Sequence, residues 1–227
     1  MACNDRPTPA SEPAVAAKVD PRRCQPGPGA TGSPSTIQEA VTLANGLPMP
    51  VSAECFVEAL DRPLRIEASK SGESLQPGLG ERSPRIFLWG SDDFVMTIVL
   101  DGKGRDLVEF GQPMGPGRSV KGELGFPLVE PTTVAAALDR VRNEEHARIT
   151  RCFVCHNREM DEPSMAGARS SLVLRPRRPS IVEIDFLRDE GQHCDKAAEP
   201  DRCRWLAAIF DHGPVEHRPF DADVPVM

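Results

Sequence analysis

Two cysteines and a histidine in the second half of the chain have a spacing that suits covalent attachment of a cofactor. They form the run Cys152-Phe153-Val154-Cys155-His156. Two thiols three residues apart lie on one side of a helical turn, so each can add to a vinyl group of one haem. The imidazole that follows lies beneath the porphyrin plane, where its neutral form can bind iron. The spacing therefore predicts a covalent haem site.

This CxxCH motif resembles that of the c-type cytochromes. The resemblance covers the five residues of the motif and implies one haem c, attached through Cys152 and Cys155, with His156 as the proximal iron ligand. It does not extend to the fold. Small soluble c-type cytochromes are mainly helical and carry the motif near the N-terminus, whereas here it lies two-thirds of the way along the chain.

The other axial position of the iron is open to several side chains. Met160 and Met165 follow the motif in a loop that can fold back over the haem, and His193, His212 and His217 are alternatives. Of these we favour Met165 and His212 as the sixth ligand. An empty sixth position would favour ligand binding or peroxide chemistry over electron transfer alone.

The same residues are also compatible with other chemistry. Cys152 and Cys155 can form a redox-active disulfide, although a helix is expected before the motif, unlike the strand–CxxC–helix order of thioredoxin-type proteins. They can also hold zinc with His156 and a distant fourth ligand such as His193 or Cys194. Zinc is the leading alternative for an intracellular protein. It is weakened because an adjacent Cys and His rarely both reach one tetrahedral ion.

The remaining cysteines favour an oxidising compartment. The chain has seven cysteines, a high number for a cytosolic protein of 227 residues. If Cys3 is lipidated and two cysteines hold haem, four remain, which is an even set that can form disulfides. Cys194–Cys203 is the local pairing, because the loop between these cysteines can close, and Cys24–Cys55 is then the second pair. The alternative is that some of the four are small buried residues.

The N-terminal residues resemble a membrane tether. Residues 1–34 are rich in Pro, Ala, Ser, Thr and Gly and have almost no large apolar residue, so we expect them to be disordered. Ala2-Cys3-Asn4 is similar to the end of a bacterial lipobox, whose cysteine carries lipid. We find no signal peptide and expect that a leader has been removed. An exported protein, periplasmic or extracellular and lipid-anchored, is the favoured interpretation, and an intracellular protein starting at Met1 is the alternative.

A second resemblance spans more of the chain. Several short runs are similar to those of uncharacterised exported lipoproteins of soil bacteria, and this similarity implies no activity. The runs are Cys55-Phe56-Val57, Ser83-Pro84-Arg85, Leu107-Val108-Glu109-Phe110, the CxxCH motif, and Cys203 followed by Phe210-Asp211-His212-Gly213.

Residues 35–130 show the pattern of a helix followed by an antiparallel sheet. Ser35-x-x-Gln38 has capping-box spacing and Asn45-Gly46 is a helix stop, which predicts a helix at about 36–45. Asp101-Gly102 between two apolar runs is a strong hairpin signal. Strands are expected at 56–60, 64–68, 86–89, 94–100, 107–110 and 120–128. The 94–100 strand should be central, and the last strand should expose Lys121, Glu123 and Gly125 to solvent.

Residues 131–227 carry the motif and fewer regular elements. A helix capped by Thr132 or Thr133 should run to about residue 151, followed by a strand at 181–186 and a helix at 203–211. The expected fold class is α+β, mainly antiparallel β in a meander or sandwich, with two or three short helices. We expect a tether over 1–34, a β-rich domain over 35–130, and a C-terminal haem or disulfide segment over 131–227.

Composition limits the function classes. The net charge of −7 disfavours binding to nucleic acid, and no apolar run is long enough to cross a bilayer. We expect a monohaem protein that acts in electron transfer or haem-based ligand binding with a redox partner protein, rather than an enzyme with a catalytic side chain. A disulfide-stapled surface lipoprotein that acts as an interaction module without haem is the alternative, and a zinc-stabilised intracellular protein is the third hypothesis.

Overall fold

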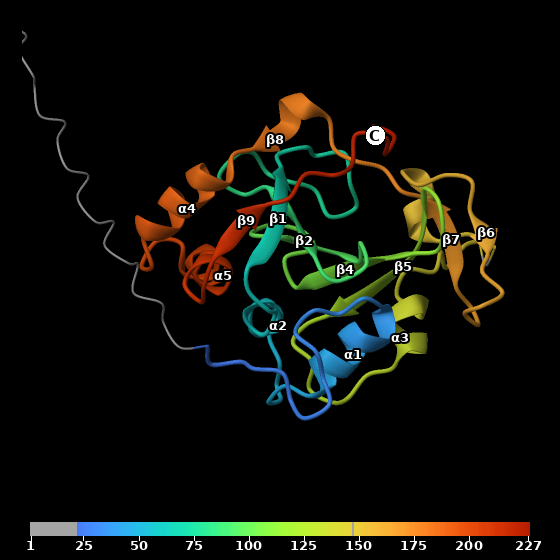
Figure 1. The fold of residues 1–227 in the computed structure, drawn as a ribbon, viewed down its shortest axis with the longest axis horizontal. Coiled ribbons are helices and arrows are strands. Elements are labelled where there is room, and N and C mark those ends of the chain that lie inside the picture. The colour runs from blue at the N-terminus through green and yellow to red at the C-terminus, as the bar shows by residue number, and fades with distance from the viewer. Residues whose placement is uncertain (1–21, 147) are drawn as a thin grey trace, which may run out of the picture.

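The computed structural model describes residues 22–146 and 148–227, which form one mainly antiparallel sheet with helices around it (Figure 1). Within these residues the sheet has nine strands in the order β6-β7-β5-β4-β3-β2-β1-β8, and β9 pairs with β1 in parallel. The expected α+β class, mainly antiparallel β, is confirmed. The strands form one sheet and not the two stacked sheets of a sandwich. The strands are β1 (Leu64–Ser69), β2 (Arg85–Trp89), β3 (Val95–Val99), β4 (Leu107–Pro113), β5 (Arg118–Gly125), β6 (Met160–Asp161), β7 (Arg169–Leu172), β8 (Ile181–Val182) and β9 (Val215–His217).

Alternation along the central strands gives the sheet two different faces. One face is apolar: the register pairs Leu88 of β2 with Met96 of β3, and Met96 with Phe110 of β4, and all three are buried. The opposite face carries polar and charged side chains at the intervening positions, such as Thr97 and Glu109. The apolar face holds the core, and the polar face is available for a site.

Three helices cover the apolar face. α1 (Ile37–Asn45) and α3 (Val134–Asp139) pack together beneath β4 and β5, with α2 (Ala53–Glu58) beside them (Figure 1). The approach is close at Gly122 of β5, where an added Cβ would lie 3.1 Å from Ile37 Cδ1. Each of these helices has a hydroxyl cap, and in α1 Thr36 accepts from the Glu39 backbone N–H. The capping box is therefore one residue later than Ser35.

Several elements differ from the sequence-based expectation. Residues 53–58 form helix α2 and not a strand, because Ser52 caps the backbone N–H of Cys55 and starts a helical turn. α3 has the expected Thr133 cap but ends at Asp139, well before the motif. The predicted strand at 181–186 is reduced to β8, and α4 (Ile184–Gln192) begins within it. The last helix, α5 (Pro200–Phe210), is found where it was expected.

The N-terminal segment is ordered earlier than expected. Cys24 is bonded to Cys55, and the backbone N–H groups of Arg23 and Cys24 both donate to Glu58 of α2. Further along, the Asp61 backbone N–H donates to the Gly32 carbonyl. The boundary of the tether therefore does not lie at residue 34, since residues 22–34 pack against the folded part. Cys3, the expected lipidation site, lies outside the described residues.

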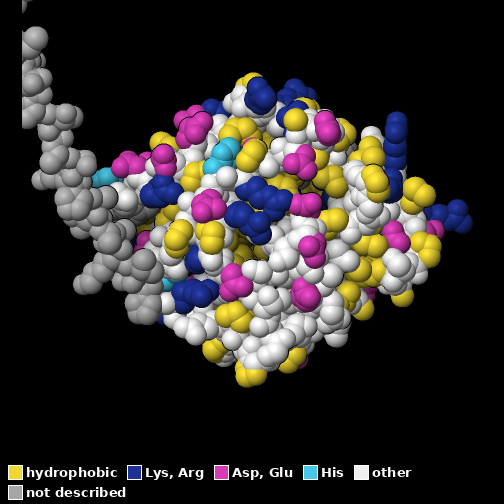
Figure 2. Space-filling model, in the orientation of Figure 1, with side chains coloured by type: hydrophobic (Ala, Val, Ile, Leu, Met, Phe, Trp, Pro, Cys, Tyr) yellow, Lys and Arg dark blue, Asp and Glu magenta, His cyan; other side chains and the backbone are white. Residues whose placement is uncertain are grey.

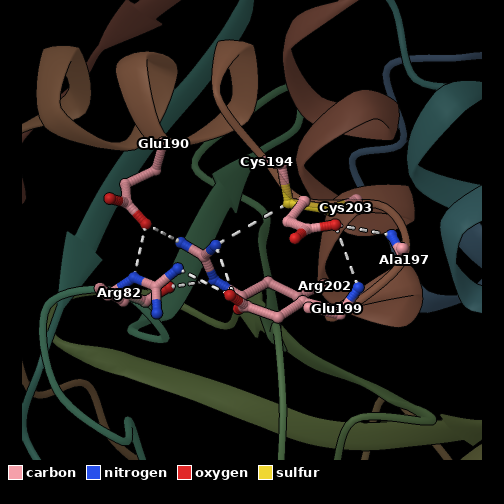
Figure 3. The surroundings of a disulfide bond; sticks show 9 residues. Arg82, Glu190, Cys194, Ala197, Glu199, Arg202 and Cys203 are labelled. Carbon is pink, nitrogen blue, oxygen red and sulfur yellow. Dashed lines mark hydrogen bonds and ion pairs between the residues drawn. A yellow bond between two sulfur atoms is a disulfide. The ribbon is translucent and has the colours of Figure 1, made fainter.

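The C-terminal part completes the sheet instead of forming a separate unit. β7 pairs with β5 at one end of the central strands, while β8 and β9 pair with β1 at the other. α4 and α5 pack against each other beside β1 and are joined by the disulfide Cys194–Cys203 (Figures 1 and 3). The division between 35–130 and 131–227 therefore crosses one continuous sheet.

The surface around this frame carries mixed charge. Lys and Arg side chains are interspersed with Asp and Glu over the face shown in Figure 2. At the end of α4, the buried Arg202 guanidinium pairs with Glu190 at 2.6 Å and Glu199 at 3.5 Å, and Arg82 pairs with the same two carboxylates (Figure 3). Among the helices of the described ranges, none has the length and apolar character needed to span a bilayer.

Candidate functional site

A cavity of about 380 Å³ lies on the polar face of the sheet, opposite α1 and α3. Alternate residues of β2–β5 form its floor. Its walls come from the loop between β1 and β2, the β4–β5 turn, the motif, residues 173–177 and residues 218–227. All three residues of the predicted site, Cys152, Cys155 and His156, line this cavity. The sequence motif therefore lies in this cavity.

A short 3₁₀ turn positions the motif. Arg151–Val154 form this turn, and the backbone N–H groups of Cys155 and His156 both donate to the Cys152 carbonyl, at 3.1 and 2.7 Å. Side chains three residues apart are eclipsed in a 3₁₀ helix, so Cys152 and Cys155 lie on the same side of the chain. The helix expected to lead into the motif is absent from residues 140–146 and 148–150, yet the spacing still brings both thiols to the cavity.

Hydrogen bonds from outside the motif hold this turn in place. Thr150 caps it by accepting from the Cys152 backbone N–H at 3.1 Å. Glu159 in turn accepts from the Thr150 backbone N–H at 2.8 Å and from its hydroxyl. On the strand side, the buried Glu123 carboxylate binds Arg140 at 3.0 Å and Arg151 at 3.1 Å. The motif is thus tied to β5 by a charged cluster, and burial raises the pKa of Glu123.

Both motif cysteines are free thiols and half-buried, whereas the other four described cysteines form disulfides. Burial raises the pKa of Cys152 to about 11, and the charge of Glu109 acts in the same direction. A thiol with a raised pKa is a poor spontaneous nucleophile, which argues against a reactive redox cysteine of the thioredoxin type. The pairings Cys24–Cys55 and Cys194–Cys203 are those favoured from the sequence.

His156 is held as a neutral imidazole. Its Nδ1 lies 2.8 Å from the Leu172 carbonyl oxygen at the end of β7. Burial lowers the pKa of His156 to about 3, and the nearby charge of Lys121 lowers it further. A neutral ring that donates from Nδ1 to a carbonyl has its lone pair on Nε2, which forms no hydrogen bond with the described residues. This is the tautomer of a metal-binding histidine whose second nitrogen is fixed by the backbone.

The floor of the cavity contains an ion pair and a separate lysine. Arg85 of β2 binds Glu109 of β4 at 2.7 Å and Thr97 of β3 at 2.9 Å. Lys121 of β5 donates to Ser119 and has no carboxylate partner among the described residues. Burial lowers the pKa of Lys121 to about 8, with Arg85 acting in the same direction. Lys121 and Glu123 were expected to face solvent, but the C-terminal part covers both.

One end of the cavity is closed by the C-terminal segment. The Phe220 ring packs edge-on against Phe87 and Trp89, with centroids 5.0 and 4.8 Å apart, and its backbone N–H donates to Glu67 at 3.1 Å. Trp89 Nε1 donates to the Arg218 carbonyl at 3.0 Å. Residues 218–227 are therefore a fixed wall of the cavity.

The two favoured sixth ligands do not line this cavity. Met165 packs against the hydrophobic core near β6 and β7, and His212 lies at the end of α5, with Nε2 3.8 Å from Glu58. Met227 is instead the methionine that lines the cavity, and His156 is the histidine. Sequence reasoning missed Met227 because only the contact between residues 225–227 and Arg175 brings it to the site.

The zinc hypothesis gains no support from the geometry. Over residues 22–146 and 148–227, no group of three or more His, Cys, Asp or Glu side chains is arranged to hold a metal ion. Cys194, one of the proposed fourth ligands, is bonded to Cys203. His193 is exposed at the end of α4, where its Nδ1 lies 3.2 Å from Asp189.

Comparison with known proteins finds no family model, no curated protein and no solved structure that matches the chain.

Proposed function

We propose that this protein carries one covalently attached haem in the cavity and acts in electron transfer or haem-based ligand binding. The observation that carries the proposal is the joint position of Cys152, Cys155 and His156 in one cavity, with His156 Nδ1 bonded to the Leu172 carbonyl. No other described cysteine pair is both free and adjacent to a histidine. Cys152 and Cys155 would form the thioethers, and His156 Nε2 would bind the iron.

Cationic side chains in the cavity walls suit the two propionates of a haem. Arg118 lies at the start of β5, and its guanidinium donates to the carbonyls of Arg158 and Ser170. Arg177 donates to the Met227 carbonyl. Arg118 forms no ion pair with a carboxylate side chain in the described part of the chain, so it can pair with a propionate. The bound haem would supply a one-electron redox centre, while the chain orients it and limits its contact with water.

Met227 is a further residue that could hold the haem iron. It is the thioether that lines the cavity, and the Met227 backbone N–H donates to the Arg175 carbonyl at 3.0 Å, which fixes the end of the wall. A His–Met pair raises the reduction potential and favours electron transfer. If Met227 does not bind the iron, the open position favours ligand binding.

The two disulfides support an oxidising compartment as part of this proposal. Cys24–Cys55 and Cys194–Cys203 would persist in the periplasm or outside the cell, where haem attachment to thiols also takes place. A lipid anchor on Cys3 is also part of the proposal, because it would hold an exported protein at a membrane surface.

The decisive experiment is maturation of the full chain in a strain with the cytochrome c maturation system. We expect a red protein that keeps its absorption after acid–acetone extraction and whose intact mass increases by one haem. The C152A/C155A double variant should lose covalent haem. The C194S/C203S variant, which also removes two sulfurs but lies away from the cavity, should retain it. A wild-type mass without added haem would overturn the proposal.

A further inference from the structure

Lys121 places on the cavity floor a positive charge that forms no ion pair with a described residue, although Glu109 and Glu159 lie near enough to favour it. Its Nζ donates to Ser119 Oγ, and the nearby Glu109 carboxylate is already bound by Arg85 at 2.7 Å. No acidic side chain in residues 22–146 or 148–227 forms an ion pair with Lys121. An ammonium group has three donors, so Lys121 can donate to a ligand in the cavity as well as to Ser119.

This arrangement is unfavourable for the folded protein on its own. Burying an unpaired charge costs free energy, and for Lys121 this cost is seen in the lowered pKa. Unfavourable charge placement is typical of binding sites, because the missing partner is supplied by a ligand. The partner that an ammonium group lacks here is an anion.

The surroundings of Lys121 limit the rest of the ligand. Phe87 and Val95 on the floor and Leu174 on the wall present apolar surface to the same cavity. A largely apolar cavity with a few convergent polar groups is the usual form of a small-molecule site, and the volume of about 380 Å³ is within the range of such sites. Gly111 adds to the space, since a Cβ there would lie 3.9 Å from Lys121 Nζ and from Val95 Cβ.

We propose that the cavity binds a carboxylic acid with an apolar body, with its carboxylate on Lys121 and its body against Phe87, Val95 and Leu174. This inference goes beyond the proposed function, because it concerns the cavity of the chain that carries no haem. A haem propionate presents the same chemistry to Lys121, and the two sources are separated by testing the protein with and without maturation.

The test uses the full chain produced without haem maturation. Octanoate and octan-1-ol are titrated against it by calorimetry and by tryptophan fluorescence, because Trp89 lines the cavity whereas Trp205 is in the core. We expect octanoate to bind at least about tenfold more tightly than octan-1-ol, as one charge-assisted hydrogen bond can provide. The ratio should fall to near one in K121M and persist in K121R. The matched control, K103M on the exposed β3–β4 turn, should behave as wild type.

The same titration on matured protein identifies the source of the carboxylate. If octanoate still binds, the acid occupies its own position beside the haem. If octanoate binding is lost and K121M shifts the haem absorption bands, the propionate occupies Lys121, which also supports a carboxylate site there. Equal affinity for octanoate and octan-1-ol in the unmatured wild type would overturn the proposal, and this outcome does not depend on haem loading, which is measured separately by mass.

Discussion

His156 Nδ1 lies 2.8 Å from the carbonyl oxygen of Leu172, the last residue of β7. This bond connects the motif to a strand that pairs with β5, so the imidazole is oriented by the sheet and not by the motif alone. A backbone carbonyl cannot be removed by mutation, which makes the orientation insensitive to side-chain changes at residue 172.

Replacing His156 should separate attachment of haem from coordination of its iron. In H156A the two thiols remain, so we expect covalent haem by mass but a changed visible spectrum and a changed reduction potential. Added imidazole should bind at the position that His156 no longer occupies. H193A, at an exposed histidine, is the control and should match the wild type. An H156A spectrum identical to that of the wild type would show that another residue binds the iron.

Met227 can be tested by its effect on potential. A thioether ligand raises the reduction potential of a haem, so M227L in the matured protein should lower the potential and alter the visible spectrum. M165L provides the matched control, because Met165 packs outside the cavity. If M165L rather than M227L changes the potential, the assignment to Met227 is wrong.

Lys121 should make stability depend on pH in a defined window. Burial lowers its pKa from about 10.5 in the unfolded chain to about 8 in the folded protein. Between these values the unfolded state binds more protons, so the contribution of Lys121 to the free energy of unfolding rises as pH increases from about 8 to about 10.5. Below pH 8 the full penalty is present, on the order of 3 kcal/mol for this lowering of the pKa.

K121M should therefore be more stable than the wild type at pH 7, and this difference should shrink towards pH 10.5. Urea denaturation of the unmatured protein at several pH values measures it, with K103M as the control. Cys152 interacts with the Lys121 charge, so the comparison is repeated in a C152S background, where the thiol does not titrate. A gain in stability for K121M that does not change with pH would point to packing rather than charge.

The two disulfides should contribute unequally to stability. Cys24 and Cys55 are 31 residues apart in sequence, whereas Cys194 and Cys203 are 9 residues apart. In the chain-entropy account a longer loop gives the larger effect, so we expect losses of about 3–4 kcal/mol for C24A/C55A and about 2–3 kcal/mol for C194A/C203A. Thermal denaturation of both variants tests which loss of stability is larger. The reverse order would indicate that contacts such as those of Arg202 contribute more to stability than the length of the closed loop does.

The sequence predicted those features that depend on local patterns. The Thr133 cap, the Asp101-Gly102 turn and the two disulfide pairs follow from spacing and turn chemistry, and the structure has all of them. Residues 56–60 were assigned wrongly because a short apolar run does not distinguish a strand from a helix, and the Ser52 cap decides between them.

The remaining differences arise from contacts between distant segments. Alternation correctly placed Lys121 and Glu123 on one face of β5, but it carries no information on what covers that face. This face of β5 is covered in part by residues more than twenty-five positions later in the chain. One of them is Arg151, whose guanidinium binds Glu123. Met227 was missed for the same reason, since its place depends on pairing with Arg175.

The pairing of β7 with β5 and of β9 with β1 has a consequence for the order of events in folding. Before the last segment docks, the sheet has unprotected outer strands, and the side of the cavity formed by residues 218–227 does not yet exist. During that interval Cys152 and Cys155 would be accessible to an enzyme that modifies them. A chain truncated before β9 would keep the thiols accessible and leave an aggregation-prone edge along β1.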